Sequence, residues 1–321
     1  MTDESDAKPA AQVELGAQVK PAAKHKKSNA LLNVMIAISA IAMIGALGLI
    51  AYPTFSDWWN RMHQSYAVAG YVEQTKDMSG AERKAMLKAA HEYNERLAAN
   101  GDRWHMTDAQ KREYDETLDV TGTGIMGYVT IPRIKVKLPV YHGTSDGVLQ
   151  IAAGHLAGTS LPVGGATTHA VVSGHTGLPS ARLLTGLDEL QKGDTFAFHV
   201  LDETYTYQVD QISVVLPSEI SKLNIESGAD YATLITCTPY GVNSHRLLVR
   251  GHRIPNPKVP DKTQYDEPGE MTAVAAAVIG LLVFVAGCAF VGLARLWRRS
   301  WIVRHGLCAG AGARHSSGVR G

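Results

Sequence analysis

The chain has 321 residues, of which 45% are hydrophobic and 19% are charged, and its formal net charge at pH 7 is +1. This length allows one large domain or two modest ones, and the near balance of charge argues against nucleic acid as a partner. The positions of the apolar residues are more informative, because two segments are each long enough to span a bilayer, which takes about 20 residues.

The two apolar segments are residues 30–51 and residues 271–293. The first is either a cleaved signal peptide or an uncleaved signal anchor, and its length favours the anchor. Basic residues flank the pair on its outer sides, so the positive-inside rule predicts two transmembrane helices, with both termini in the cytoplasm and the intervening chain outside. The competing interpretation is that both segments are buried core helices. Tryptophans that suit the membrane interface follow each segment: Trp58, Trp59, Trp297 and Trp301.

Two helices are expected between the first span and the β-rich part of the chain. Ser79 and Glu82 have the spacing of a capping box at the start of the first helix, and Thr107 with Gln110 opens the second. The loop between the helices, DRWHM at residues 102–106, carries a tryptophan. A tryptophan in a short loop usually packs against another part of the protein, and its partner is not evident from the sequence.

From Ile125 onward, seven short β-rich runs are separated by Gly, Pro, Asp and Ser, which predicts an all-β barrel or sandwich. Helical interruptions are expected near residues 146–152 and 181–190. Pro132 and Pro139 indicate strand edges or bulges, because proline cannot donate to a β-ladder.

Neither a cofactor nor a metal site is predicted. The glycines of GTGIMG, residues 122–127, satisfy the dinucleotide-binding pattern, but a helix precedes them and a strand follows, which reverses the order that the fingerprint requires. A turn is the better interpretation. Histidines are numerous, but none forms an HExxH pair, and His169 and His175 would lie about 20 Å apart on an extended strand.

Cys237 is the sole cysteine of the outward-facing segment, because Cys288 lies in the second apolar segment and Cys308 in the C-terminal tail. Outside the cell, such a thiol is buried and inert, joined to another molecule, or reactive. His175 follows an apolar run and is expected at a strand end, where a histidine alone is more often structural. A solitary cysteine and a histidine distant in sequence are, however, what a thiol nucleophile with a base partner requires.

Arg246 lies nine residues after Cys237, on the next predicted strand. If the two strands form a hairpin, these residues stand across from each other at its loop end. The Arg246 guanidinium is then placed to bind the oxyanion that forms when a thiolate attacks a carbonyl carbon. Arg250 and Arg182 are expected to have surface or salt-bridge roles.

The stretches TLITC, SGHTGLPSARLL and HRLLVRGH, which contain His175, Cys237 and Arg246, resemble the sortase family, and more narrowly the class C, pilin-polymerising sortases of Gram-positive bacteria. The resemblance covers roughly residues 79–254 and implies a closed eight-stranded β-barrel with short helices. It implies that Cys237 attacks an LPxTG-like sorting signal to form a thioacyl-enzyme. His175 would protonate the leaving amine and then deprotonate a lysine of the next pilin, which gives an isopeptide bond.

Class C sortases also carry a lid before the barrel, in which an Asp-Pro-aromatic motif occupies the active site. Asp102 and Trp104 match its first and third positions, but Arg103 replaces the proline. The resemblance implies a lid in which Asp102 meets the catalytic groups and Trp104 covers the cysteine. Without the proline the loop is less fixed in φ, which predicts a more mobile lid. The alternative is an ordinary helix–helix loop.

The expected partners are pilin subunits with an LPxTG-like signal and an acceptor lysine, together with membrane lipid, and no nucleic acid. A sortase that anchors proteins to the cell wall and a non-catalytic adaptor that binds sorting signals are the alternatives. The expected organisation, in chain order, is a disordered cytoplasmic tail (1–28), a transmembrane helix (30–51), a helical N-terminal and lid region (53–121), the sortase β-barrel (122–254), a linker (255–270), a second transmembrane helix (271–293) and a cytoplasmic tail (294–321).

Overall fold

The computed structural model describes residues 30–258, 265, 276, 280–288 and 290–292. The described residues between 44 and 287 belong to one compact unit. Residues 30–43, at the start of the first helix, belong to a second unit. The expected tails, 1–28 and 294–321, lie outside the described residues. So do Trp297 and Trp301, and most of the expected linker.

Helix α1 (Ala30–Asp77) is 48 residues long and is apolar enough to cross a membrane by length and composition. It continues well past the predicted end of the span and contains Pro53, which removes a single backbone donor from the ladder. Packing explains why the helix persists, because Val68 and Tyr71 in its last turns are buried. In the region of the predicted second span, the described residues give a shorter apolar helix, Gly280–Gly292, so a second membrane-spanning helix is not confirmed.

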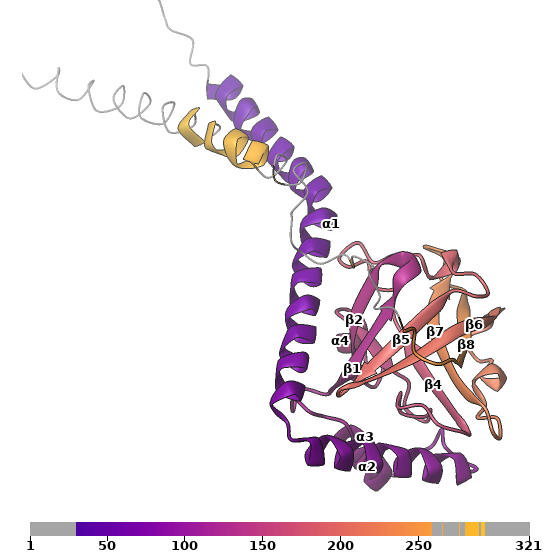
Figure 1. The fold of residues 1–321 in the computed structure, drawn as a ribbon. Coiled ribbons are helices and arrows are strands. Elements are labelled where there is room, and N and C mark those ends of the chain that lie inside the picture. The colour runs from indigo at the N-terminus through magenta and orange to yellow at the C-terminus, as the bar shows by residue number, and fades with distance from the viewer. Residues whose placement is uncertain (1–29, 259–264, 266–275, 277–279, 289, 293–321) are drawn as a thin grey trace, which may run out of the picture. The chain divides into compact units, whose positions relative to one another are not determined.

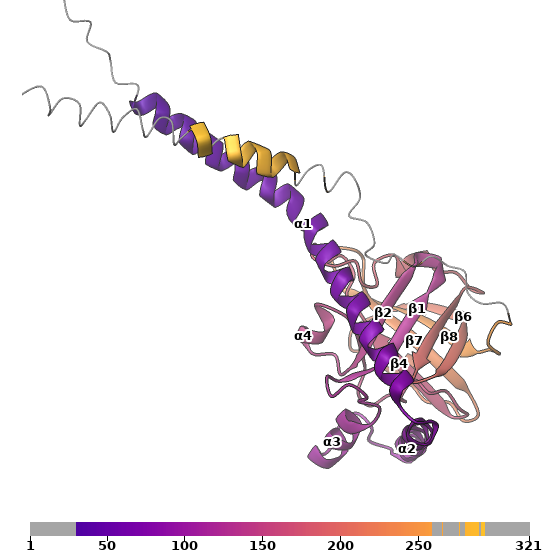
Figure 2. The same ribbon diagram turned by 60° about the vertical axis from the view of Figure 1, so that its left-hand side comes forward.

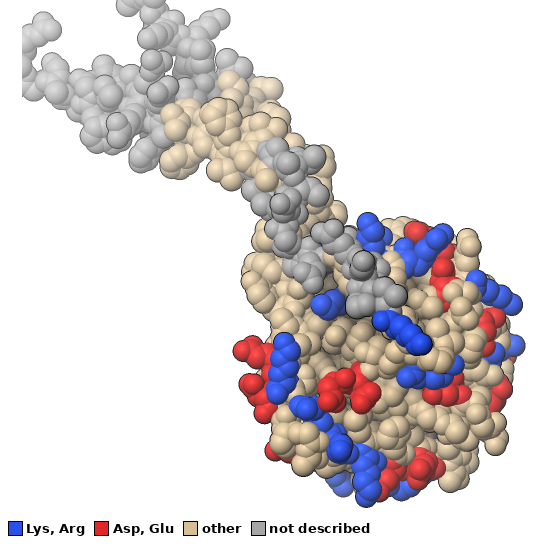
Figure 3. Space-filling view, viewed as in Figure 1, with Lys and Arg blue, Asp and Glu red and all other residues tan. Residues whose placement is uncertain are grey.

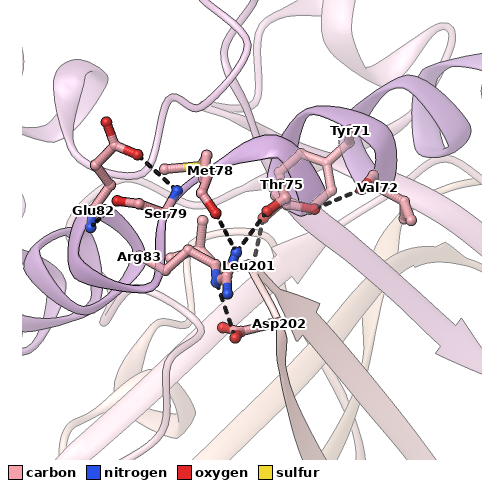
Figure 4. Close-up of polar contacts among 9 residues, drawn as sticks. All are labelled: Tyr71, Val72, Thr75, Met78, Ser79, Glu82, Arg83, Leu201 and Asp202. Atoms are coloured by element: carbon pink, nitrogen blue, oxygen red, sulfur yellow. Dashed lines mark hydrogen bonds and ion pairs between the residues drawn. The ribbon is translucent and has the colours of Figure 1, made fainter.

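The end of α1 is attached to the barrel through the buried side chain of Tyr71. Its hydroxyl donates to the carbonyl of Met126 (3.1 Å) and accepts from the backbone N–H of Leu201 (2.7 Å). Arg83, at the start of the next helix, ties the same corner together, as Figure 4 shows. Its Nη1 donates to the carbonyls of Thr75, in the last turn of α1, and of Met78, just after the helix, and its Nε lies 3.0 Å from the carboxylate of Asp202.

Helices α2 (Gly80–Ala99) and α3 (Asp108–Glu116) lie side by side at one end of the barrel (Figures 1 and 2). Both predicted capping boxes are present, with Ser79 and Thr107 as the N-caps. Asn94 attaches α2 to the barrel unit: its side-chain amide donates to the carbonyl of Leu161 (3.0 Å) and accepts from the same residue's N–H (2.7 Å).

Eight strands close into a barrel in the order β1-β2-β3-β4-β7-β8-β6-β5, which confirms the predicted fold. The β2–β3 and β4–β7 pairs are parallel, and the other neighbours are antiparallel. Short helical turns interrupt the chain between strands. The strands are β1 (Ile125–Ile131), β2 (Val136–His142), β3 (Ala153–His155), β4 (Thr168–Ser173), β5 (Thr195–Val200), β6 (Glu203–Val215), β7 (Asp230–Thr238) and β8 (His245–Arg253); the turns are η1 (Pro132–Ile134), α4 (Asp146–Leu149), η2 (Leu187–Glu189) and η3 (Ser221–Leu223).

The two faces of β7 show how the barrel separates its core from its outer surface. Ala232 and Leu234 are fully buried in the main hydrophobic core, whereas Ile235 belongs to a second apolar cluster. Successive side chains of a strand point to opposite faces, so Cys237 lies on the same face as Ile235. Acidic and basic side chains are interspersed on the surface drawn in Figure 3, which agrees with the small net charge of the chain.

Candidate active site

Cys237 lies at the penultimate position of β7, a strand that has β4 on one side and β8 on the other. The antiparallel register of β7 and β8 pairs Cys237 directly with Arg246, as expected for hairpin partners. Side chains that are directly opposite each other on neighbouring strands lie on the same face, about 5 Å apart at Cβ. The Arg246 side chain therefore begins next to the thiol.

His175 follows the end of β4 by two residues, and its position relative to Cys237 is fixed by the parallel pairing of β4 with β7. In that register Ser173 is the partner of Ile235. The chain stays attached beyond the strand, because Gly174 N–H donates to the carbonyl of Ile235 (3.0 Å) and the Thr236 hydroxyl donates to the carbonyl of Gly174 (2.8 Å). The register, extended two residues past the end of β4, brings position 175 level with Cys237.

Three neighbouring chain segments thus carry His175, Cys237 and Arg246, with Cys237 and Arg246 paired on the same face. All three side chains are half-buried. Cys237 lies on the central segment, with the segment that leads to His175 on one side and the strand of Arg246 on the other. This arrangement suits a thiol nucleophile, because an adjacent base activates the thiol and a fixed cation stabilises a developing oxyanion.

The loop between β7 and β8 shapes the approach to these residues. Arg246 Nη1 donates to the carbonyls of Asn243 (3.2 Å) and His245 (3.1 Å), which holds the guanidinium at the loop. Its Nε and Nη2 make no hydrogen bond within the described part of the chain. The ring of Tyr240 lies against Gly177, where an added Cβ would stand 2.9 Å from it. The Tyr240 ring therefore brings this loop against the loop that carries His175.

Directly next to the pair of Cys237 and Arg246, the outer face of the barrel carries an apolar patch, which we call the outer patch: Val171, Leu223, Ile235 and Leu248. Ile235 pairs with Leu248, two residues before Cys237 along β7 and on the same face as the Cys237–Arg246 pair. Trp104, from the α2–α3 loop, packs on the outer patch. The tryptophan of DRWHM therefore packs on the outer face of the barrel, against the cluster that contains Ile235; that its ring covers Cys237 stays a prediction.

Asp102 and Arg103, the neighbours of Trp104, have different environments. The Asp102 carboxylate lies 2.7 Å from His105 Nδ1 within the same loop, and both side chains are largely exposed. Within the described part of the chain, Asp102 has no hydrogen bond to His175, Cys237 or Arg246. Arg103 is buried, and its guanidinium donates to the barrel. Sequence reasoning treated Arg103 only as a missing proline and did not identify this contact.

Other polar residues singled out in the sequence have structural roles. Arg250 makes a two-pronged ion pair with Asp210, at 3.1 Å for each contact, and stacks on Tyr231, which confirms the salt-bridge interpretation. His169 bridges the Asn224 carbonyl and the Thr233 hydroxyl, and burial lowers its pKa. The GTGIMG segment bends at residues 122–124, and its residues 125–127 are the start of β1.

Comparison with known proteins adds to this geometry. A model of the Sortase domain family matches residues 129–254. Among curated proteins, Sortase A of Streptococcus agalactiae serotype III (strain NEM316) is 29% identical over 117 residues, which is 36% of this chain and 47% of that protein. Sortase A of Bacillus anthracis is 27% identical over 149 residues, 45% of this chain and 69% of that protein. The chain thus matches only about half the length of the first of these relatives.

Solved structures are more similar and are covered more completely. Sortase C1 from Streptococcus agalactiae has a TM-score of 0.59 and 51% identity over 60% of this chain and all of that chain. Streptococcus pneumoniae sortase C has a TM-score of 0.54 and 45% identity over 60% of this chain and 97% of its own. Clostridium perfringens sortase C, solved with the C-terminal cell wall sorting motif, has a TM-score of 0.53 and 40% identity over 60% of this chain and all of that chain.

Proposed function

The chain belongs to the sortase family and, within it, to the class C enzymes, and from this premise we propose that it is a cysteine transpeptidase that joins pilin subunits. The substrate is an LPxTG-like sorting signal, and the acceptor is a lysine amine of the next pilin. The observation that carries this proposal is the placement of His175, Cys237 and Arg246 on three neighbouring segments. The Clostridium perfringens relative, which was solved with a sorting motif, supports the substrate class.

In the acylation step, the Cys237 thiolate attacks the carbonyl carbon of the threonine in the sorting signal. The C–N bond to the following glycine breaks, and the His175 imidazolium gives its proton to the departing amine. A thioester between Cys237 and the threonine remains. An imidazolium beside the cysteine favours the thiolate, because a nearby cation stabilises the negative sulfur.

In the second step, the lysine amine attacks the thioester carbonyl and His175 takes a proton from the nitrogen. The C–S bond breaks, Cys237 leaves as the thiolate, and an isopeptide bond joins the two subunits. Arg246 acts in both steps, because each passes through a tetrahedral oxyanion that its guanidinium binds; its pairing with Cys237 supports this role. Preorganised donors of this kind typically contribute about 100-fold to 1,000-fold in rate.

We also propose that the α2–α3 loop acts as a lid over this site, with Trp104 as its contact to the outer patch. The hydrogen bond of Asp102 to His105 supports a role for Asp102 within the loop in this closed arrangement. The chain is proposed to be anchored in the membrane by α1 and by a second span at residues 271–293, with both termini in the cytoplasm. The basic residues on the outer flanks of the two apolar segments support this topology.

The test is to incubate the purified protein with a sorting-signal peptide and a lysine-containing pilin peptide, and to identify an isopeptide-linked product by mass. We expect the product with the native protein, none with Cys237→Ala, and a loss of about 100-fold or more in kcat/KM with Arg246→Lys, because lysine lacks the planar fork. Arg250→Lys is the matched control and should keep the activity. Cleavage without transfer to lysine would contradict the transpeptidase proposal, as would unchanged turnover in Arg246→Lys.

A further inference from the structure

The loop that carries Trp104 is attached to the barrel by its central residue. Arg103 has only 9% of its surface exposed, although it is an arginine in a surface loop. Its Nη1 donates to the carbonyl of Gly158 (2.8 Å), and its Nη2 donates to the carbonyl of Leu223 (3.0 Å) and lies 3.4 Å from Asn224 Oδ1. The guanidinium therefore connects the loop to two separate segments, one between β3 and β4 and the other between β6 and β7.

The acceptors of Arg103 are neutral. Within the described residues, no carboxylate lies within ion-pair distance of the guanidinium, so neutral groups, the carbonyl oxygens and the Trp104 ring, offset its loss of hydration. Burial of a charge without a counter-charge is costly, and hydrogen bonds to a charged group recover part of that cost. Such an attachment holds the loop but does not fix it permanently, since water can replace the carbonyls when the loop leaves.

The barrel is also shaped to accept the loop in this position. Gly158 has φ +85, and a Cβ on it would stand 2.6 Å from the carbonyl oxygen of Arg103 and 3.1 Å from the Trp104 ring. Only glycine leaves room for the backbone of the loop to approach this closely. The Arg103 guanidinium carbon lies 4.3 Å from the centre of the Trp104 ring, so the two side chains dock as one stacked unit.

We propose that Arg103 is a positioning residue that latches the loop over the outer patch and so controls the access of substrate to Cys237. Trp104 occupies the outer patch, whose Ile235 is two residues from the nucleophile on the same face of β7. An apolar side chain of an incoming sorting signal and the Trp104 ring compete for this patch. This inference rests on the proposed function, because it names the regulation of the same site.

The latch also changes the expectation drawn from the sequence. The absence of proline at position 103 predicted a more mobile lid, since φ is less restricted. The arginine supplies direct attachment instead, because its two carbonyl contacts exist only when the loop is docked. Loop closure in this chain therefore depends on a removable interaction and not on backbone stiffness.

The test measures the rate at which a maleimide reagent modifies Cys237 in the full-length protein, with Cys288→Ser and Cys308→Ser as the background so that one thiol reacts. Loss of the charged hydrogen bonds in Arg103→Ala should raise this rate roughly tenfold to a hundredfold. Arg103→Lys, with a shorter reach and no fork, should give an intermediate rate. The control is Arg112→Ala, an exposed arginine of α3, which should leave the rate unchanged.

A second variant tests the latch from the barrel side, in case Arg103→Ala perturbs folding. Gly158→Ala places a methyl group against the docked loop and should also speed modification of Cys237. Gly193→Ala is its control, because Gly193 also has a positive φ (+96) but no heavy atom within 4 Å of the added Cβ. If both Arg103→Ala and Gly158→Ala keep the native melting temperature and the native modification rate, the latch is wrong.

Kinetics with a sorting-signal peptide separate the latch from a merely structural role. Arg103→Ala should lower KM about as much as it raises the modification rate and leave kcat unchanged, because it removes a competitor and does not touch the reacting atoms. A fall in kcat without a change in KM would contradict the latch. Thiol modification does not require turnover, so an inactive protein whose modification rate still responds to Arg103 would contradict the proposed function and leave the latch standing.

Discussion

His155 gives a prediction for the pH dependence of stability that follows directly from its contacts. It lies at the end of β3 and is fully buried. Its Nε2 donates to the carbonyl of Ser160 (2.8 Å), and its Nδ1 lies 3.0 Å from the hydroxyl of Tyr114 on α3. Burial lowers the pKa of His155 to about 4 from its ordinary value of 6.5, and the neighbouring His142 adds to this effect.

The effect of pH on folding stability follows from the difference between the pKa of His155 in the folded and the unfolded chain. The unfolded chain binds the proton more tightly than the folded one, so His155 contributes full stability above about pH 6.5 and loses it as the pH falls toward 4. One pKa unit corresponds to about 1.4 kcal/mol, so this depression amounts to roughly 3 kcal/mol. For a domain of this size the melting temperature should fall by about 6–12 °C as a result.

The assay is urea or thermal unfolding of the protein between pH 7.5 and pH 4.5, compared with His155→Gln. Glutamine keeps a donor near Ser160 but does not titrate, so its unfolding free energy should be lower at pH 7.5 and depend less on pH. His105→Gln, at a largely exposed histidine, is the control and should follow the native curve. A His155→Gln curve parallel to the native curve over this range would refute the reasoning.

Three further substitutions test the structural account. Asn94→Ala leaves both backbone groups of Leu161 without their buried partner and should lower the unfolding free energy by about 2–4 kcal/mol, measured by urea denaturation. Arg250→Ala removes the ion pair with Asp210 and should cost about 1–2 kcal/mol without changing the rate of Cys237 modification. Phe198→Ala opens a cavity in the barrel core and should cost about 3–5 kcal/mol.

Each of these has an outcome that would contradict it. A cost below about 0.5 kcal/mol for Asn94→Ala, as expected of a surface site, would mean that α2 is not held by this amide. Faster modification of Cys237 in Arg250→Ala would show that the Asp210 pair also controls access to the thiol. A small effect of Phe198→Ala would place that ring outside the packed core.

The barrel could be predicted because most of its strands are long enough to show β-rich composition and clear turns. Strand β3, Ala153–His155, was missed because three residues cannot show a period. The helix expected at 181–190 is reduced to the single turn η2, Leu187–Glu189. The extension of α1 past Pro53 depends on packing of Val68 and Tyr71 against distant parts of the chain, which local patterns do not contain.

The candidate site, too, could be predicted from the sequence only where it depends on residues close together in the chain. The pairing of Cys237 with Arg246 follows from hairpin spacing, which is local information. The placement of position 175 level with Cys237 depends on the parallel pairing of β4 with β7, two strands that are far apart in sequence. The partner of Trp104 and the burial of Arg103 depend on how the α2–α3 loop docks. The loop sequence shows that proline is absent but not the carbonyls that receive the guanidinium; the greater mobility of the loop stays a prediction.

The central claim is that Cys237 forms a thioester with the threonine of a sorting signal. The most direct measurement is the mass of the protein after incubation with an LPxTG-type peptide in the absence of an amine acceptor, with the Arg103→Ala variant in parallel to open the latch. We expect an added mass equal to the peptide up to its threonine, located on Cys237 by fragmentation and lost on treatment with hydroxylamine. An adduct that persists in Cys237→Ala, or no adduct in the native protein and the opened variant, would contradict the mechanism.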